Sequence, residues 1–81
     1  MTAERLRVMQ QFEAEVRVYL ARMKMKDRNF YQATLARLAE VNVNTLRSAM
    51  SCNRYCEPLM ETVRAYMEAN PADEPQNESE V

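Results

Sequence analysis

Apolar residues recur every three or four positions along most of this 81-residue chain, which is the period of an α-helix. In the first third of the chain they form one stripe, made up of Leu6, Met9, Phe12, Val16, Tyr19, Leu20 and Met23. The stripe predicts a long helix from about Ala3 to Lys24, and Thr2 stands before it as an N-cap residue.

Two short apolar segments follow and predict two short helices. The first is expected over Phe30 to Ala39, with Asn29 as its N-cap. Its expected inward positions are Tyr31, Leu35, Leu38 and Ala39. The second is expected from Val43 to about Met50, with Asn42 as its N-cap and Leu46 and Met50 facing the core.

A fourth helix is expected to begin at Pro58, because proline suits a first helical turn, and to end near Asn70 before Pro71. Its expected inward positions are Leu59, Met60, Val63, Tyr66 and Met67. Since the chain contains no Gly, strand hairpins are not expected, and the fold class is all-α. We expect one compact four-helix domain over residues 1–69 and a flexible acidic tail over residues 70–81.

The composition argues against catalysis and against a bound cofactor. There is no His, the commonest general base and metal ligand, and no Gly for a phosphate-binding loop. Cys52 and Cys56 alone are too few for a disulfide scaffold or a zinc site, and free thiols fit the cytoplasm. No apolar run is long enough to cross a membrane.

Charge is segregated along the chain although the net charge is only −1. Between Val16 and Arg54 there are eight basic residues and only two acidic ones, Asp27 and Glu40. The tail contains acidic residues and no basic one. A basic patch on a small helical domain is typical of nucleic-acid binding, and a solvated helix face is the alternative interpretation.

The segment from Gln32 to Met50 reads QATLARLAEVNVNTLRSAM. Ala36 is small where two helices would cross closely. The minimal core of the segment would be Leu35, Ala39, Val41 and Leu46. The polar side of the last helix would then point outward, with Val43, Asn44, Arg47 and Ser48 on it. A short helix with an exposed polar face suits insertion into a DNA major groove.

This pattern resembles the helix-turn-helix of phage repressors, Cro proteins and lac-repressor-type headpieces. It is carried by Gln32, Leu35-Ala36, Ala39, Val41 and Thr45-Leu46, and the similarity extends over about Val16 to Ala69. Asn53-Arg54 looks like the residues that follow the recognition helix in this family, with Asn53 replacing a glycine in a left-handed cap.

The resemblance implies DNA-contacting roles by position. Base reading would fall to Val43, Asn44, Arg47 and Ser48. Gln32, Asn42 and Arg54 would contact phosphates, and Arg28, Lys26 and Arg37 of the basic stretch would add further backbone contacts. Two positions depart from the family pattern: Glu40 stands where the turn favours Gly, and Ala49 stands where a larger apolar residue is usual.

The sequence therefore predicts a small cytoplasmic DNA-binding regulator, of the repressor type, that recognises a two-fold site in double-stranded DNA as a homodimer. Two surfaces compete for the dimer contact: the Leu6, Met9, Phe12 face and the Met60, Tyr66, Met67 face. The alternative role of the first face is to cover the core of the chain. The alternative is an inhibitor or adaptor, of the antitoxin or phage anti-defence type, that keeps this fold and binds a protein partner.

Overall fold

The computed structural model describes residues 2–72, and over this range the chain forms four α-helices. They are α1 (Ala3–Lys26), α2 (Gln32–Ala39), α3 (Val43–Met50) and α4 (Glu57–Ala69). The expected all-helical, compact four-helix fold is confirmed. Most of the predicted acidic tail, residues 73–81, lies outside the described residues.

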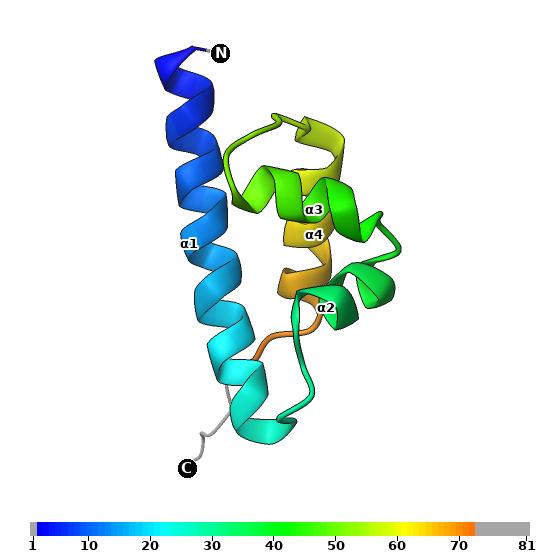
Figure 1. Ribbon diagram of the computed structural model, residues 1–81. Helices are drawn as coiled ribbons and strands as arrows, with labels where there is room; N and C mark the ends of the chain where they lie inside the picture. The colour runs from blue at the N-terminus through cyan, green and yellow to red at the C-terminus, as the bar shows by residue number, and fades with distance from the viewer. Residues whose placement is uncertain (1, 73–81) are drawn as a thin grey trace.

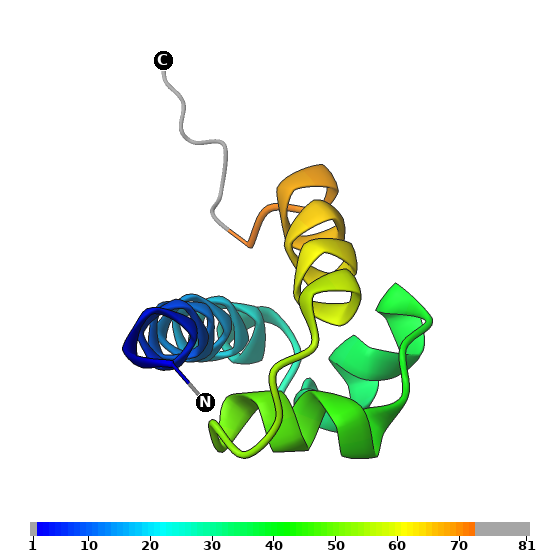
Figure 2. The same ribbon diagram turned by 90° about the horizontal axis from the view of Figure 1, so that it is seen from above.

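Helix α1 is the long element of the fold, with 24 residues, and the other three helices pack on one side of it (Figure 1). Viewed from above, α2, α3 and α4 lie together beside α1, and no other helix of the described residues covers the opposite side of α1 (Figure 2). The Thr2 hydroxyl oxygen accepts a hydrogen bond from the Arg5 backbone N–H at 3.1 Å, which confirms the predicted N-cap. The helix continues two residues beyond the expected end, to Lys26.

One hydrophobic core joins all four helices. Its largest fully buried side chains are Phe12, Met9, Leu35, Leu46, Met60, Val16 and Val63. The sequence placed Met9, Phe12 and Met60 on candidate dimer surfaces, but these side chains are buried within the chain itself. Neither proposed surface is therefore available as a whole for contact with a second copy.

The start of α2 differs from the expectation. Asn29 is not the N-cap: its N–H donates to the Asp27 Oδ1 at 3.0 Å, which holds the segment in a turn, and the helix begins at Gln32. Phe30 is buried instead, with its ring edge-on to Tyr19 at a centroid distance of 6.2 Å. Because Phe30 takes the inward place, Tyr31 is 53% exposed, and Leu38 further along is 41% exposed. The inward positions predicted for Tyr31 and Leu38 are wrong.

Two helices end with a residue in the left-handed region. After α2, Glu40 has φ 60° and ψ 45°, and the Val41 N–H donates to the Ala36 carbonyl at 2.9 Å. After α3, the left-handed residue is Cys52, with φ 59°, and not the predicted Asn53. The Asn53 N–H instead donates to the Ser48 carbonyl at 2.9 Å. Both ends are Schellman motifs, which normally place glycine at the left-handed position.

Helix α4 begins at Glu57, one residue before the predicted Pro58, and Asn70 follows its last residue as expected. The Asn70 N–H and side-chain Nδ2 both donate to the Tyr66 carbonyl, at 2.9 and 3.1 Å. Leu59 and Val63 are buried as predicted, whereas Tyr66 is only half-buried. In the first helix, Leu6 of the predicted inward stripe is 39% exposed.

Candidate nucleic-acid interface

Helix α3 is fixed at both ends and packed along one side. At its start, the Asn42 Oδ1 accepts hydrogen bonds from the backbone N–H groups of Asn44 and Thr45, at 2.8 and 3.1 Å, as the sequence predicts. Along its inner side Leu46 and Ala49 are fully buried, and Met50 is nearly so. The small Ala49 therefore fits its site in the core. The remaining side of α3 is held in one orientation by this packing.

Three of the four predicted base-reading residues lie on this outer side of α3, whereas Val43 lies at its edge and packs against the core. Asn44 and Arg47 are exposed, whereas Val43 and Ser48 are half-buried. Positions three and four apart on a helix are neighbours, so Asn44, Arg47 and Ser48 form one continuous surface. The Ser48 carbonyl accepts backbone N–H groups from Asn53 and Arg54, which turns the chain away from α3 after its last residue.

A groove of about 690 Å³ lies beside this surface, between α1 and the α2–α3 pair. Its lining residues are Arg17, Leu20, Ala21, Lys24, Tyr31, Gln32, Ala33 and Arg47. We call it the basic groove, because three cationic side chains and no acidic one line it. It brings together Gln32 and Arg47, two residues that the sequence assigned to DNA contact, from two different helices.

The cations of the basic groove differ in their own contacts. The Lys24 ammonium lies 4.3 Å from the centre of the Tyr31 ring, a cation–π arrangement. The Arg17 Nε pairs with the Glu13 carboxylate one helical turn earlier. Arg47 forms no ion pair with any acidic residue of the described chain. Among the three cations, Arg47 is therefore the one for which the described residues supply neither an ion pair nor a ring contact.

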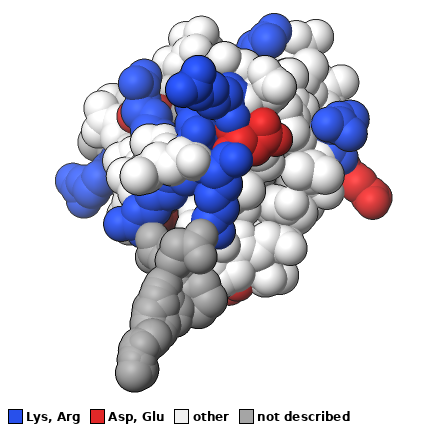
Figure 3. Space-filling view, turned by 90° about the horizontal axis from the view of Figure 1, so that it is seen from below, with Lys and Arg blue, Asp and Glu red and all other residues white. Residues whose placement is uncertain are grey.

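The other predicted phosphate contacts lie outside the groove. Arg28, Arg37 and Arg54 are exposed, in the loop after α1, on α2 and after α3 respectively, and Lys26 is the last residue of α1. Viewed toward the end of α1, basic side chains gather over one part of the surface (Figure 3). The Asn42 oxygen caps α3, so only the Nδ2 of its side chain is left to donate to a ligand.

Sequence reasoning assigned no site role to Arg17, Lys24 or Tyr31, which line the basic groove. Arg17 and Lys24 are seven residues apart, two helical turns, and therefore share one side of α1. This spacing was the available signal. It could not show that the shared side faces α3, because the packing of α1 on α3 depends on the whole core.

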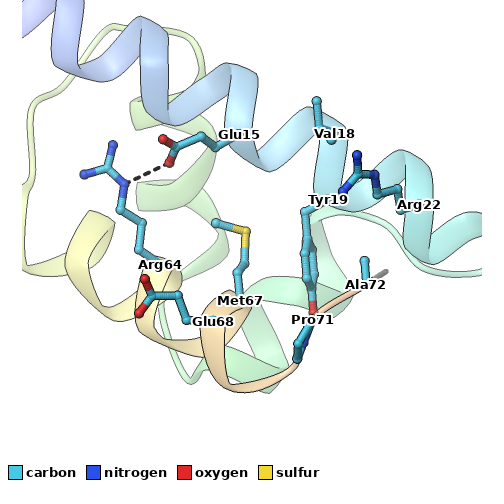
Figure 4. A pocket seen from close by; sticks show the side chains of 9 residues that line it. All are labelled: Glu15, Val18, Tyr19, Arg22, Arg64, Met67, Glu68, Pro71 and Ala72. Carbon is cyan, nitrogen blue, oxygen red and sulfur yellow. Dashed lines mark hydrogen bonds and ion pairs between the residues drawn. The ribbon is translucent and has the colours of Figure 1, made fainter. Parts of the chain in front are cut away.

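Helix α1 has a second groove on its other side, where it meets α4 and residues 70–72 (Figure 4). This C-terminal groove measures about 420 Å³, and its charged side chains are Glu15, Arg22, Arg64 and Glu68. The Arg64 Nε pairs with the Glu15 Oε1 at 3.0 Å. Positive and negative charges are balanced here, in contrast to the basic groove.

The C-terminal groove is also closed at one end by the chain itself. The Tyr19 hydroxyl donates to the Asn70 carbonyl at 2.7 Å, and Ala72 is buried. Burial raises the pKa of the Tyr19 hydroxyl, and the neighbouring Tyr66 adds to this effect. The first residues after α4 are thus part of the packed structure.

Residues 2–72 contain no cluster of three or more side chains able to hold a metal ion. Over the same range no helix combines the length and apolarity needed to span a membrane. No protein-family model, curated protein or solved structure matches this chain. The function must therefore be inferred from the arrangement of its own residues.

Proposed function

We propose that this protein binds double-stranded DNA, with α2 and α3 acting as a helix-turn-helix and α3 entering the major groove. The observation that carries the proposal is the exposed outer side of α3, on which Arg47 stands without an internal counterion beside a groove lined by Arg17 and Lys24. Such a residue can exchange water for a base edge or a phosphate without first losing a protein partner.

The dimensions support this assignment. A helix with its side chains is about 10–12 Å across and the major groove is about 12 Å wide, so α3 fits along its floor. Asn44 is suited to bond adenine, Val43 to contact a thymine methyl group, and Arg47 to reach a guanine edge or a phosphate. Ser48 is the fourth residue that we assign to base reading.

The charge distribution also supports the outer side of α3 as the DNA-contacting surface. Helix α4, on the other side of α3, contains Glu57, Glu61 and Glu68 against a single basic residue, Arg64. The basic residues of α1, α2, α3 and their loops would instead track the phosphate backbone. We assign backbone contacts to Gln32, Arg28, Lys26, Arg37 and Arg54, and add Arg17 and Lys24 to them. The resulting binding should weaken steeply with salt, because each neutralised phosphate releases counterions.

The biological role that fits is a transcription regulator of the repressor type. A gel-shift measurement with random duplex at low salt tests DNA binding first, and selection of bound duplexes from a random pool then tests sequence preference. A protein that shifts no duplex at low salt is not a DNA-binding protein of this kind. A selected site without any preferred bases would reject base reading by α3.

A second candidate function is recognition of a protein partner by the same fold. The observation that favours it is the exposed Leu38 on α2, together with the acidic Glu40 at the adjacent turn, since neither suits contact with a phosphate backbone. An inhibitor or adaptor would show no affinity for duplex at low salt, so the same gel shift separates the two candidates.

A further inference from the structure

The side of α1 that faces away from the core has an apolar stripe. Ala14, Val18, Ala21 and Met25 follow one another at spacings of four, three and four residues, and all are exposed. Val18 is 50% exposed and Met25 is 87% exposed, the two highest values among the large apolar side chains of α1. This spacing places the four residues on one line along the helix. We call it the outer stripe.

Within residues 2–72 no other helix lies on the outward side of α1 (Figure 2), and all four residues of the outer stripe are exposed. In the close-up of the C-terminal groove, Val18 points away from α4, whereas Tyr19 beside it points toward Pro71 (Figure 4). We propose that a second copy of this chain packs on the outer stripe, with the two α1 helices antiparallel. Val18 then lies against Ala21 of the second copy, and Met25 lies against its Ala14.

Side-chain size favours the antiparallel direction. With residues 14 and 25 opposite each other, and 18 opposite 21, each larger side chain meets an alanine, so the two helices can approach closely over the whole stripe. In a parallel pair each residue meets its own copy. Met25 would then meet Met25 while Ala14 met Ala14, which leaves one end crowded and the other end empty.

Charge favours the same direction. Around the start of the stripe, residues 8–15 of α1 include Glu13 and Glu15 and no basic residue. Around its end, residues 20–26 include Arg22, Lys24 and Lys26 and no acidic residue. The antiparallel pair places the acidic segment of each copy opposite the basic segment of the other. A parallel pair would place the three basic residues opposite their own copies.

The two-fold axis of this pair has a consequence for α3. It runs between the α1 helices and perpendicular to them, so the same flank of each α1 points to the same side of the dimer. Since α3 lies on one flank of α1, with its last residues nearest to α1 (Figures 1 and 2), both α3 helices face that side. Both α3 helices would then approach a duplex from the same side, as binding to a two-fold site requires.

Cysteine cross-linking tests the direction directly, in full-length chains in which Cys52 and Cys56 are replaced by Ser. In the antiparallel pair the two copies of residue 18 lie close to the axis, within the reach of a disulfide, whereas the two copies of residue 25 are about 16 Å apart along the helices. Oxidised Val18→Cys should therefore form a covalent dimer and oxidised Met25→Cys should not. Cross-linking of both variants would indicate a parallel pair, and cross-linking of neither would indicate no pairing here; either result overturns the proposal.

Sedimentation of the unmodified chain, up to about 1 mM, measures the strength of the association. The stripe spans only about 18 Å, so we expect a weak dimer. Val18→Glu should raise the dimer dissociation constant at least tenfold, whereas Ala65→Glu, which adds the same charge on the exposed side of α4, should not change it. Circular dichroism checks that both variants keep their helices. An unchanged constant for Val18→Glu would reject the outer stripe as the interface.

The recognition of a two-fold site rests on the proposed DNA binding, but the self-association does not. A chain that cross-links as expected and shifts no duplex at low salt would reject only the DNA-binding function. A chain that binds duplex while Val18→Cys fails to cross-link would reject only the dimer. A selected site with two-fold symmetry, bound less tightly by Val18→Glu, would support both.

Discussion

The two grooves beside α1 are both lined by arginines, but only the C-terminal groove also contains acidic residues that can pair with them. In the C-terminal groove, Arg64 pairs with Glu15, and the chain after α4 closes one end through Tyr19. In the basic groove, no acidic residue is among the lining residues, and Arg47 has no ion pair within the described chain. The first groove contributes to the stability of the fold. The second leaves positive charge unpaired within the described residues, and the proposed function assigns DNA binding to this side of α1.

The largest effect expected from the comparison is on DNA affinity. Arg47→Ala should lower the affinity for the selected duplex by about 1–3 kcal/mol and relax the preference at one base pair, because a base or phosphate contact is lost. The matched control is Arg64→Ala, which removes the same charge from the C-terminal groove and should leave the affinity unchanged. Equal losses for the two variants, measured by titration at one salt concentration, would mean that the grooves do not differ in function.

The next effect is on stability. Tyr19→Phe should lower the free energy of unfolding by about 0.5–1.5 kcal/mol, because the hydrogen bond to the Asn70 carbonyl is lost. Denaturant unfolding measures this loss, and DNA affinity should not change. A loss of affinity together with intact stability would show that the C-terminal groove takes part in binding.

Tyr19 also gives a pH dependence with a definite sign. Its pKa is raised in the folded chain, so the folded state holds the proton more tightly than the unfolded state. This contribution to stability is complete below the ordinary tyrosine pKa of about 10 and disappears as the pH rises through the higher folded value. Unfolding in alkaline solution should therefore be less steep with pH for Tyr19→Phe than for the natural chain.

A smaller effect concerns the left-handed residue between α2 and α3. Glu40→Gly should stabilise the fold by about 0.5–1 kcal/mol, because glycine adopts this conformation without steric cost. Glu40→Gln keeps the backbone cost and removes only the negative charge, so it should leave stability nearly unchanged. Thermal melts of the two variants separate backbone strain from charge. If Glu40→Gln stabilises as much as Glu40→Gly, the charge and not the conformation is unfavourable.

The smallest effect is on the salt dependence of binding. Arg17→Ala and Lys24→Ala should each reduce the slope of log affinity against log salt by about 0.9, if each cation neutralises one phosphate. Glu61→Gln, a change of one charge on α4, should not alter this slope. Unchanged slopes for Arg17→Ala and Lys24→Ala would remove both residues from the interface and leave α3 and its neighbouring arginines as the contact surface.

The sequence determined the local structure of this protein. Periodicity predicted four helices, capping chemistry located Thr2 and Asn42 at helix ends, and Pro71 placed the end of the fourth helix near Asn70. These features depend on residues only a few positions apart. The outer side of α3 was also predictable, since burial of Leu46 and Met50 leaves Asn44 and Arg47 outside. The segregation of basic residues in Val16 to Arg54 followed from counting alone.

Only the tertiary structure decided which side chains from different helices become neighbours. The choice between Phe30 and Tyr31 as the buried ring depended on a contact with Tyr19, eleven residues earlier, and on a turn held by Asp27. The basic groove exists only because α1 packs against the α2–α3 pair, which brings Arg17 and Lys24 to Arg47. The outer stripe is exposed for the same reason: one long helix has two sides, and the core of an 81-residue chain covers only one of them.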